Sequence, residues 1–277
     1  MEIKWKANAK VNLALDVLEE REDGYHEIDT VMQEISLHDV LTFETGRGGF
    51  ALTCSNPHLI LDDHNLVYRA WHLLKDRVKD PSVVIHIEKN IPLAAGLAGG
   101  STDAAATLLA LNRMWSLNMS KEELETLAAQ LGSDVPFFLY GGTMRAQGRG
   151  ECLTRLPSYA GHWLVLVNNG ESISSQYVYA RVPMGGSIRI NTFVERLESG
   201  NPRVTDLMEN QMEKVSFATM PQLMTIAREL EEQGALVARM SGSGPTMFGV
   251  FENKEYAEKA KKALQDKYPT VLVVETL

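Results

Sequence analysis

Cysteine is scarce in this sequence. Its two cysteines, Cys54 and Cys152, lie far apart and fit neither a disulfide framework nor the spacing of a zinc site. Long apolar runs are also missing, since no stretch approaches the ~20 residues needed to cross a bilayer. The first residues carry lysines without the apolar core or small-residue cleavage site of a secretion signal. We therefore expect unpaired thiols, no membrane partner and a cytoplasmic location.

Positive charge is in short supply as well. Lysine and arginine number 27 against 36 aspartates and glutamates, and the net charge is −9. This balance provides no broad basic surface for DNA, RNA or anionic lipid, so no nucleic-acid partner is expected. A phosphate-bearing ligand must instead be held by local backbone amides and a few cations. The 44% apolar and 23% charged composition is that of a globular protein with a sizeable core.

Strands and helices are both predicted throughout the chain. Clusters of β-branched and aromatic residues between turn signals predict strands at residues 11–18, 40–44, 50–54, 83–87, 163–167, 246–251 and 271–275. Apolar residues at helical spacing predict helices over residues 66–78, 104–114, 120–131, 221–233 and 256–264. Ser120 and Glu123 form a capping box at the start of the third of these helices. The fold class is therefore α+β, with a domain boundary near residues 150–165.

The most informative stretch is residues 91–103, which contain three glycines and precede the helix predicted at 104–114. Glycines let a backbone approach a ligand closely, and a helix start offers unpaired N–H groups and a partial positive charge. Ser101 and Thr102 add hydroxyls for a phosphate oxygen or a magnesium ion, and one of them or Asp103 is expected to cap the helix. The alternative is a tightly packed structural loop. A Walker loop and a dinucleotide fingerprint are excluded, because neither pattern is present.

Three segments in order along the chain resemble the motifs of the GHMP kinases, the family of galactokinase, homoserine kinase, mevalonate kinase and phosphomevalonate kinase. They are residues 6–13, 96–103 and 240–246. The resemblance implies an α+β fold with an N-terminal ribosomal-protein-S5-like domain, a C-terminal ferredoxin-like α/β sandwich and an active site in the cleft between them. The expected domains are an ATP-binding domain over residues 1–155 and a substrate-side domain over residues 156–277.

The resemblance also implies an activity, the transfer of a phosphoryl group from ATP to an alcohol. Mg²⁺ is expected to arrive with the nucleotide and no fixed metal site is expected. Residues 23–26, 65–66, 131–138 and 141–143 are similar to a branch of the family that phosphorylates an alcohol carrying a cytidine diphosphate group, in non-mevalonate isoprenoid biosynthesis. By this resemblance Asp134 is the catalytic base and Lys10 is its electrostatic partner.

The same resemblance assigns the binding residues. Those implied to bind ATP are Asn65, Lys89, Pro92, Ala95, Gly96, Leu97, Ala98, Gly99, Gly100, Ser101 and Thr102. Those implied to bind the substrate are Asn12, Tyr25, His26, Ser175, Tyr179, Gly242 and Ser243. Tyr25 is expected to stack on cytosine, with His26 at the edge of the base and Tyr179 on its opposite face.

The sequence departs from the family pattern at a few positions. Asn8 and Gln176 stand where proline is usual, Thr102 stands where serine is usual, and residues 168–171 replace a more basic, proline-bearing segment. Because residues 168–179 lie where the family lines its substrate pocket, the acceptor stays open. The alternatives are another small alcohol, such as mevalonate or homoserine, and a family member that binds ligand without catalysis. A monomer or a homodimer is expected.

Overall fold

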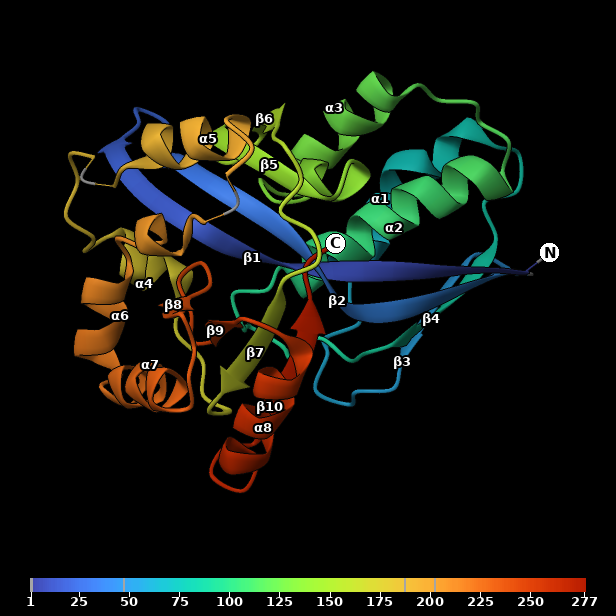
Figure 1. Ribbon diagram of the computed structural model, residues 1–277. Helices are drawn as coiled ribbons and strands as arrows, with labels where there is room; N and C mark the ends of the chain where they lie inside the picture. Colours follow the sequence, from blue (N-terminus) through green and yellow to red (C-terminus); the bar gives the residue numbers. More distant parts are fainter. Residues whose placement is uncertain (1, 47, 187, 202) are drawn as a thin grey trace. The chain divides into compact units, whose positions relative to one another are not determined.

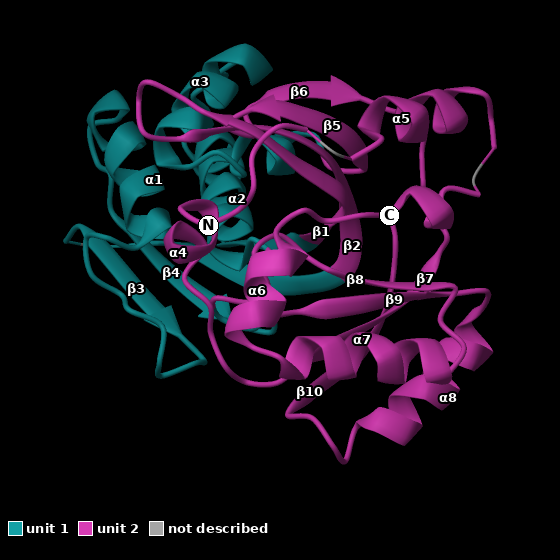
Figure 2. Ribbon diagram, turned by 90° about the vertical axis from the view of Figure 1, so that its left-hand side faces the viewer, with its two compact units in different colours: residues 1–9, 37–93, 98–140 teal, residues 10–36, 94–97, 141–277 magenta. Residues whose placement is uncertain are grey.

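The computed structural model describes residues 2–46, 48–186, 188–201 and 203–277, and the chain forms two compact units (Figure 1). Unit 1 gathers the chain up to residue 9, residues 37–93 and residues 98–140. Unit 2 contains residues 10–36, 94–97 and 141 onward (Figure 2). Each unit is thus assembled from separate stretches of sequence. The division into family domains at residue 155 stays a prediction, because compact units do not define those domains.

Two long strands, β1 (Glu2–Glu20) and β2 (His26–Thr45), pair with each other and contribute residues to both units. The sequence predicted only short parts of them, at residues 11–18 and 40–44. Buried polar side chains such as Asn12 and Thr30 explain the difference. They interrupt the apolar pattern by which a strand is recognised in a sequence.

Unit 1 combines a sheet with three helices. Strand β3 (Phe50–Cys54) pairs in parallel with β4 (Val83–Glu88), and β4 pairs antiparallel with the second part of β2. The helices are α1 (Leu66–Leu74), α2 (Gly99–Met114) and α3 (Lys121–Leu131), with 3₁₀ helices at Lys75–Arg77 and Pro136–Leu139. Their apolar faces share one core, in which Phe43, Leu74, Ala105 and Leu108 are fully buried.

Local signals determine where the helices of unit 1 begin and end. The predicted capping box of α3 is confirmed, since Ser120 accepts from the Glu123 backbone and Glu123 accepts from the Ser120 backbone. The predicted extension of α1 to residue 78 is wrong. The chain passes through a 3₁₀ turn and is extended at Val78, and Trp71 Nε1 donates to the Pro81 carbonyl at 2.9 Å.

Unit 2 holds two groups of strands. The first part of β2 pairs antiparallel with β5 (Thr143–Gly148), which pairs with β6 (Cys152–Arg155). A second, antiparallel sheet has the order β10 (Thr270–Glu275), β7 (Trp163–Asn168), β9 (Met247–Phe251), β8 (Val237–Met240). The helices are α4 (Ser175–Tyr179), α5 (Ile190–Glu198), α6 (Glu213–Thr219), α7 (Gln222–Glu232) and α8 (Lys254–Leu264), with a 3₁₀ helix at Thr205–Leu207.

The core of unit 2 lies on the four-stranded sheet. Val165 and Val167 of β7 pack in one cluster with Leu223 and Ile226 of α7 and with Leu264 of α8. Strand β7 has a neighbour on each side, so its predicted central position is confirmed. The α+β class is confirmed as well, because both units combine helices with antiparallel pairs of strands.

The structure shows the state of the two cysteines and the character of the helices. Cys54 is half-buried and Cys152 is exposed, and both are free thiols, as expected. Among the residues that the structure describes, no helix has the length and apolar character needed to cross a membrane.

Candidate active site

The predicted phosphate loop leads into α2, which begins at Gly99, earlier than predicted. The N-cap residue is Ala98, in the left-handed conformation with φ 57°, and no side chain caps the helix. The prediction that Ser101, Thr102 or Asp103 caps α2 is therefore wrong, since all three lie inside the helix. Because the side chain of the N-cap residue satisfies none of them, the first N–H groups of α2 are suited to an anion.

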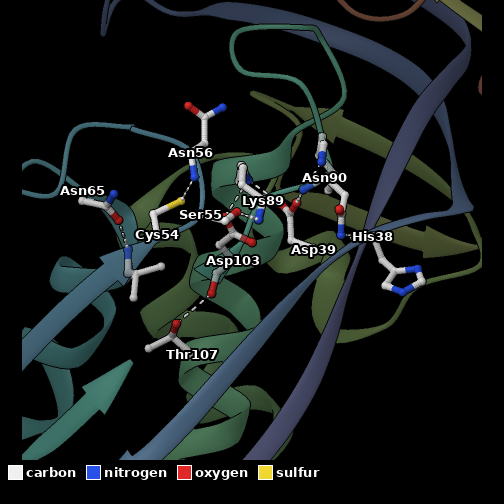
Figure 3. Close-up of polar contacts among 12 residues, drawn as sticks. His38, Asp39, Cys54, Ser55, Asn56, Asn65, Lys89, Asn90, Asp103 and Thr107 are labelled. Carbon is white, nitrogen blue, oxygen red and sulfur yellow. Dashed lines mark hydrogen bonds and ion pairs between the residues drawn. The ribbon is translucent and has the colours of Figure 1, made fainter. Parts of the chain in front are cut away.

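A buried charged cluster packs against this first turn (Figure 3). Lys89, directly after β4, forms ion pairs with Asp39 of β2 and with Asp103 of α2, at 2.7 Å between Lys89 Nζ and Asp103 Oδ2. The Lys89 side chain is only 2% exposed. A β-carbon at Gly99 would lie 3.0 Å from Lys89 Nζ, so the ammonium touches the first residue of the helix. We call Asp39, Lys89 and Asp103 the ionic cluster.

The two carboxylates of the ionic cluster are not equivalent. Asp39 Oδ1 accepts from the backbone N–H groups of Asn90, at 2.6 Å, and Ile91, at 2.8 Å, while Asp39 Oδ2 accepts from Lys89. Asp103 Oδ1, by contrast, is buried without a hydrogen-bond partner among the described residues. Burial, only partly offset by Lys89, raises the pKa of Asp103 to about 7. Asp103 is thus the member of the ionic cluster that takes a proton near neutral pH.

Two residues predicted to bind ATP already have other polar partners. Asn65 caps α1, with its Oδ1 accepting from Val67 N at 2.9 Å and its Nδ2 donating to the Ile60 carbonyl at 2.7 Å. The ammonium of Lys89 forms ion pairs with Asp39 and Asp103. Their contacts with ATP stay predictions. Among the other predicted ATP residues of unit 1, Gly100 is exposed, whereas Thr102 is 2% exposed.

Lys10 lies in unit 2, in the middle of β1, and is buried. Its Nζ donates to Asn12 Oδ1 at 2.5 Å and to the Gly96 carbonyl at 3.4 Å. Asn12 is oriented in turn by Thr30, whose hydroxyl accepts from Asn12 Nδ2 at 2.9 Å and donates to the Ala14 carbonyl at 2.7 Å. The structure therefore brings together two predicted site residues, Lys10 and Asn12, with the predicted phosphate loop.

The predicted C-terminal motif, residues 240–246, forms a turn against the same loop residue. Ser241 Oγ donates to the Gly96 carbonyl at 2.9 Å. Gly96 has φ 75°, and a β-carbon there would lie 2.3 Å from the Ser241 carbonyl oxygen, so only glycine fits. Gly242 faces Asn12, because a β-carbon on it would lie 3.5 Å from Asn12 Oδ1. Two motifs that are far apart in the sequence therefore meet in unit 2.

The predicted cytidine residues are partly assembled. The rings of His26 and Tyr179 lie 5.1 Å apart between centroids. Tyr25 is 54% exposed, and the guanidinium of Arg149 lies 4.9 Å from its ring centroid. Ser175 Oγ and Ser243 Oγ are hydrogen-bonded at 2.7 Å. Tyr179 thus neighbours His26, and the side chain that flanks Tyr25 is Arg149, which the sequence did not indicate.

Asp134 lies in unit 1, in the turn between α3 and the 3₁₀ helix Pro136–Leu139, and is half-buried. Its predicted partnership with Lys10 stays a prediction.

Sequence reasoning missed residues that support the site. Asp39 stands in a strand with no motif around it, so no local signal marks it. Asn210 lies in a stretch without a family motif, yet its side chain donates to two carbonyls of the 240–246 turn.

Comparison with known proteins matches the chain to two family models. The model of the GHMP kinases N terminal domain matches residues 65–142, and the model of the GHMP kinases C terminal domain matches residues 195–270. Among curated proteins, 4-diphosphocytidyl-2-C-methyl-D-erythritol kinase of Caldanaerobacter subterraneus is 42% identical, covering 100% of this chain and 98% of that protein. The enzyme of the same name from Clostridium botulinum is 38% identical, covering 98% and 99%.

Solved structures agree with this assignment. A crystal structure of 4-(cytidine 5'-diphospho)-2C-methyl-D-erythritol kinase has a TM-score of 0.83 at 34% identity and covers 99% of both chains. Homoserine kinase from Cytophaga hutchinsonii has a TM-score of 0.75 at 17% identity, covering 100% of this chain and 95% of that chain, and shares the fold. The predicted α+β GHMP kinase fold is confirmed, and the chain belongs to the GHMP kinase family.

Proposed function

We propose that this chain transfers the terminal phosphoryl group of ATP to the 2-hydroxyl of 4-diphosphocytidyl-2-C-methyl-D-erythritol, a step of non-mevalonate isoprenoid precursor biosynthesis. The observation that carries the proposal is similarity over the full length, at 38–42% identity, to enzymes that bear the name of this activity. ATP as the donor follows from membership of a kinase family.

The start of α2 supports the donor side of the reaction. Its first turn has no side-chain cap, and a β-carbon on Gly100 would meet only Leu66 Cδ1, at 3.7 Å. The backbone N–H groups of residues 99–101 therefore have room for phosphate oxygens and offer them a partial positive charge. Mg²⁺ arriving with the nucleotide would neutralise part of the polyphosphate charge. The residues proposed to hold ATP are those of the predicted set, from Asn65 to Thr102.

Catalysis is assigned to two residues. Asp134 accepts the proton of the attacking hydroxyl or orients that hydroxyl, and Lys10 offsets negative charge on the reacting oxygens. The placement of Lys10 supports its role, because it is buried and donates to Asn12 and to the loop carbonyl of Gly96. A buried ammonium held in one position stabilises developing charge better than a solvated one.

The acceptor side is assigned to unit 2. His26 and Tyr179 offer adjacent rings and Tyr25 offers an exposed one, which suits a pyrimidine base. Asn12, Ser175, Gly242 and Ser243 supply polar contacts for the rest of the substrate. A nonaromatic acceptor, such as mevalonate or homoserine, has no ring that could stack on these aromatic side chains.

The experiment is a turnover assay of the purified full chain with ATP and four acceptors. These are the cytidyl substrate, mevalonate, phosphomevalonate and homoserine. We expect kcat/KM to be highest for the cytidyl substrate. A higher value for any other acceptor rejects the proposed substrate but not the kinase activity, and turnover of none of them points to a ligand-binding family member.

A further inference from the structure

The turn of residues 240–246 is held in place by one buried side chain, that of Asn210. Asn210 Nδ2 donates to the Met240 carbonyl at 2.8 Å and to the Gly242 carbonyl at 2.7 Å, so a single amide bridges two carbonyls at the start of the turn. Its Oδ1 accepts from Met212 N at 2.9 Å. Asn210 is 6% exposed. Two donated bonds and one accepted bond satisfy most of what an asparagine amide can form.

Asn210 is anchored to the strand that carries Lys10. Leu15 N of β1 donates to the Glu209 carbonyl at 2.9 Å, and Gln211 N donates back to the Leu15 carbonyl at 3.0 Å. The side chain of Gln211 adds a third link, since its Oε1 accepts from Val17 N at 2.6 Å. Asn210 thus sits on β1 through backbone and side-chain bonds on both sides of it.

The same part of the turn reaches Lys10 through Gly96. Ser241, between the two carbonyls that Asn210 holds, donates to the Gly96 carbonyl, and Lys10 Nζ donates to the same oxygen. Lys10 N also donates to the Leu97 carbonyl at 3.2 Å. The contacts close a ring that runs from β1 through Asn210, the turn and the phosphate loop back to Lys10. A shift of the turn therefore moves the carbonyl to which the ammonium is bonded.

From this ring we infer that Asn210 is a positioning residue for the Lys10 ammonium, an inference that rests on the proposed kinase function. Asparagine is the side chain that meets the need. Aspartate has the same shape but presents oxygens to two carbonyl oxygens, and serine has a single donor. Two further side chains support the turn from α6, since Glu213 accepts from Met240 N at 2.8 Å and Ser216 donates to the Ser243 carbonyl at 3.1 Å.

The test compares the full chain with the variants N210A, N210D and N112A. Asn112 is the matched control, because its amide also bridges a loop: it donates to the Met119 carbonyl and accepts from Met119 N, within unit 1. Steady-state kinetics with ATP and the cytidyl substrate are measured at about pH 8 and about pH 6, together with thermal unfolding.

N210A and N210D are expected to lose about 10²-fold in kcat at about pH 8, the scale of a small misplacement of a reacting group. KM for ATP is expected to change by less than about threefold. N210D should recover relative to wild type at the lower pH, because a protonated aspartate regains one donor for the two carbonyls. Charged side chains near Asn210 include Glu209, which pairs with Arg189, and also Glu213 and Arg239. They are present in wild type and in N210D alike, so the ratio of the two kcat values cancels the effect of their titration.

The results decide the question as follows. Recovery of N210D at low pH, with N112A keeping kcat while losing comparable thermal stability, supports the inference. A kcat loss in N210A no larger than that in N112A, or an N210D ratio that does not change with pH, overturns it. Should N210A fail to fold, N210D carries the test alone, since it preserves the volume of the side chain. Absence of turnover by wild type would reject the proposed function instead.

Discussion

Two buried lysines, Lys89 in unit 1 and Lys10 in unit 2, differ in their neighbours. Lys89 is paired with the carboxylates of Asp39 and Asp103, while Lys10 donates to the amide oxygen of Asn12 and to a backbone carbonyl. In the ionic cluster the lysine is a counter-ion that secures the fold around α2. In unit 2 Lys10 donates to two neutral oxygens that are themselves fixed, since Asn12 donates to Thr30 and the Gly96 carbonyl also accepts from Ser241. We therefore expect the loss of Lys89 to lower the stability of the fold and the loss of Lys10 to lower turnover.

The largest effect that bears on this comparison is expected at Lys10. The substitution Lys10→Met keeps the apolar stem and removes the charge, so kcat is expected to fall by about 10²- to 10⁴-fold, the scale of lost charge stabilisation or acid–base help. For Asp134→Asn we expect kcat to fall by a similar factor. The measurement is kcat with ATP and the cytidyl substrate, at a temperature where circular dichroism shows a folded protein. If Lys10→Met keeps a tenth or more of wild-type kcat, the catalytic assignment of Lys10 is wrong.

At Lys89 the expected loss is one of stability. Lys89→Met leaves two buried carboxylates without their cation, and breaking such a pair costs about 3–5 kcal/mol of unfolding free energy. Denaturant unfolding at about pH 9, where Asp103 is ionised in the wild type, measures the loss. The double variant Lys89→Met with Asp103→Asn removes one of the stranded carboxylates, so it should be more stable than Lys89→Met alone. Equal or lower stability of the double variant would show that Asp103 is not an uncompensated charge.

The free energy of unfolding is also expected to depend on pH, because two buried carboxyl groups have raised pKa values. Burial raises the pKa of Glu213 to about 7, as it does for Asp103. An acid whose pKa is higher in the folded protein than in the unfolded chain stabilises the fold while it is protonated. Its contribution is complete below about pH 4 and is lost as the pH rises to about 7, on the order of 3 kcal/mol per group. Lys89, whose pKa is raised, does not titrate in this range.

The comparison of wild type with Glu213→Gln isolates one of these acids. The glutamine keeps an oxygen that can accept from Met240 N and has no proton to lose. Its unfolding free energy should therefore fall less steeply than that of wild type between about pH 4 and about pH 7. Parallel curves for the two proteins would mean that Glu213 ionises at its ordinary pKa.

Local signals in the sequence were sufficient for much of the fold. Strand β3 at residues 50–54 and the capping box of α3 were predicted correctly, because each depends on residues adjacent in the chain. The start of α2 was not. Ser101, Thr102 and Asp103 are good capping residues, but the left-handed Ala98 begins the helix earlier, a conformation that no propensity for alanine indicates.

The site shows the same division. Motifs led to Lys10, Asn12, Gly96 and Gly242, which the structure brings together in unit 2. Nothing in the sequence led to Asp39 or Asn210, whose partners are some 50 and 30 residues away along the chain. Such contacts are set by the packing of the whole chain, and a single sequence does not display them.

The smallest expected effect concerns the hydrogen bonds that orient Asn12 beside Lys10. Thr30→Val keeps the shape of a fully buried side chain but deprives Asn12 Nδ2 of its acceptor and the Ala14 carbonyl of a donor. A buried donor left without an acceptor costs about 1–3 kcal/mol, so unfolding free energy should fall by that amount. Because Asn12 Oδ1 still accepts from Lys10, kcat should fall by about 10-fold at most, far less than in Lys10→Met. Thr30→Ser, which retains the hydroxyl, should restore most of the lost kcat. A Thr30→Val enzyme as impaired as Lys10→Met would mean that the orientation of Asn12, rather than the charge of Lys10, governs the reaction.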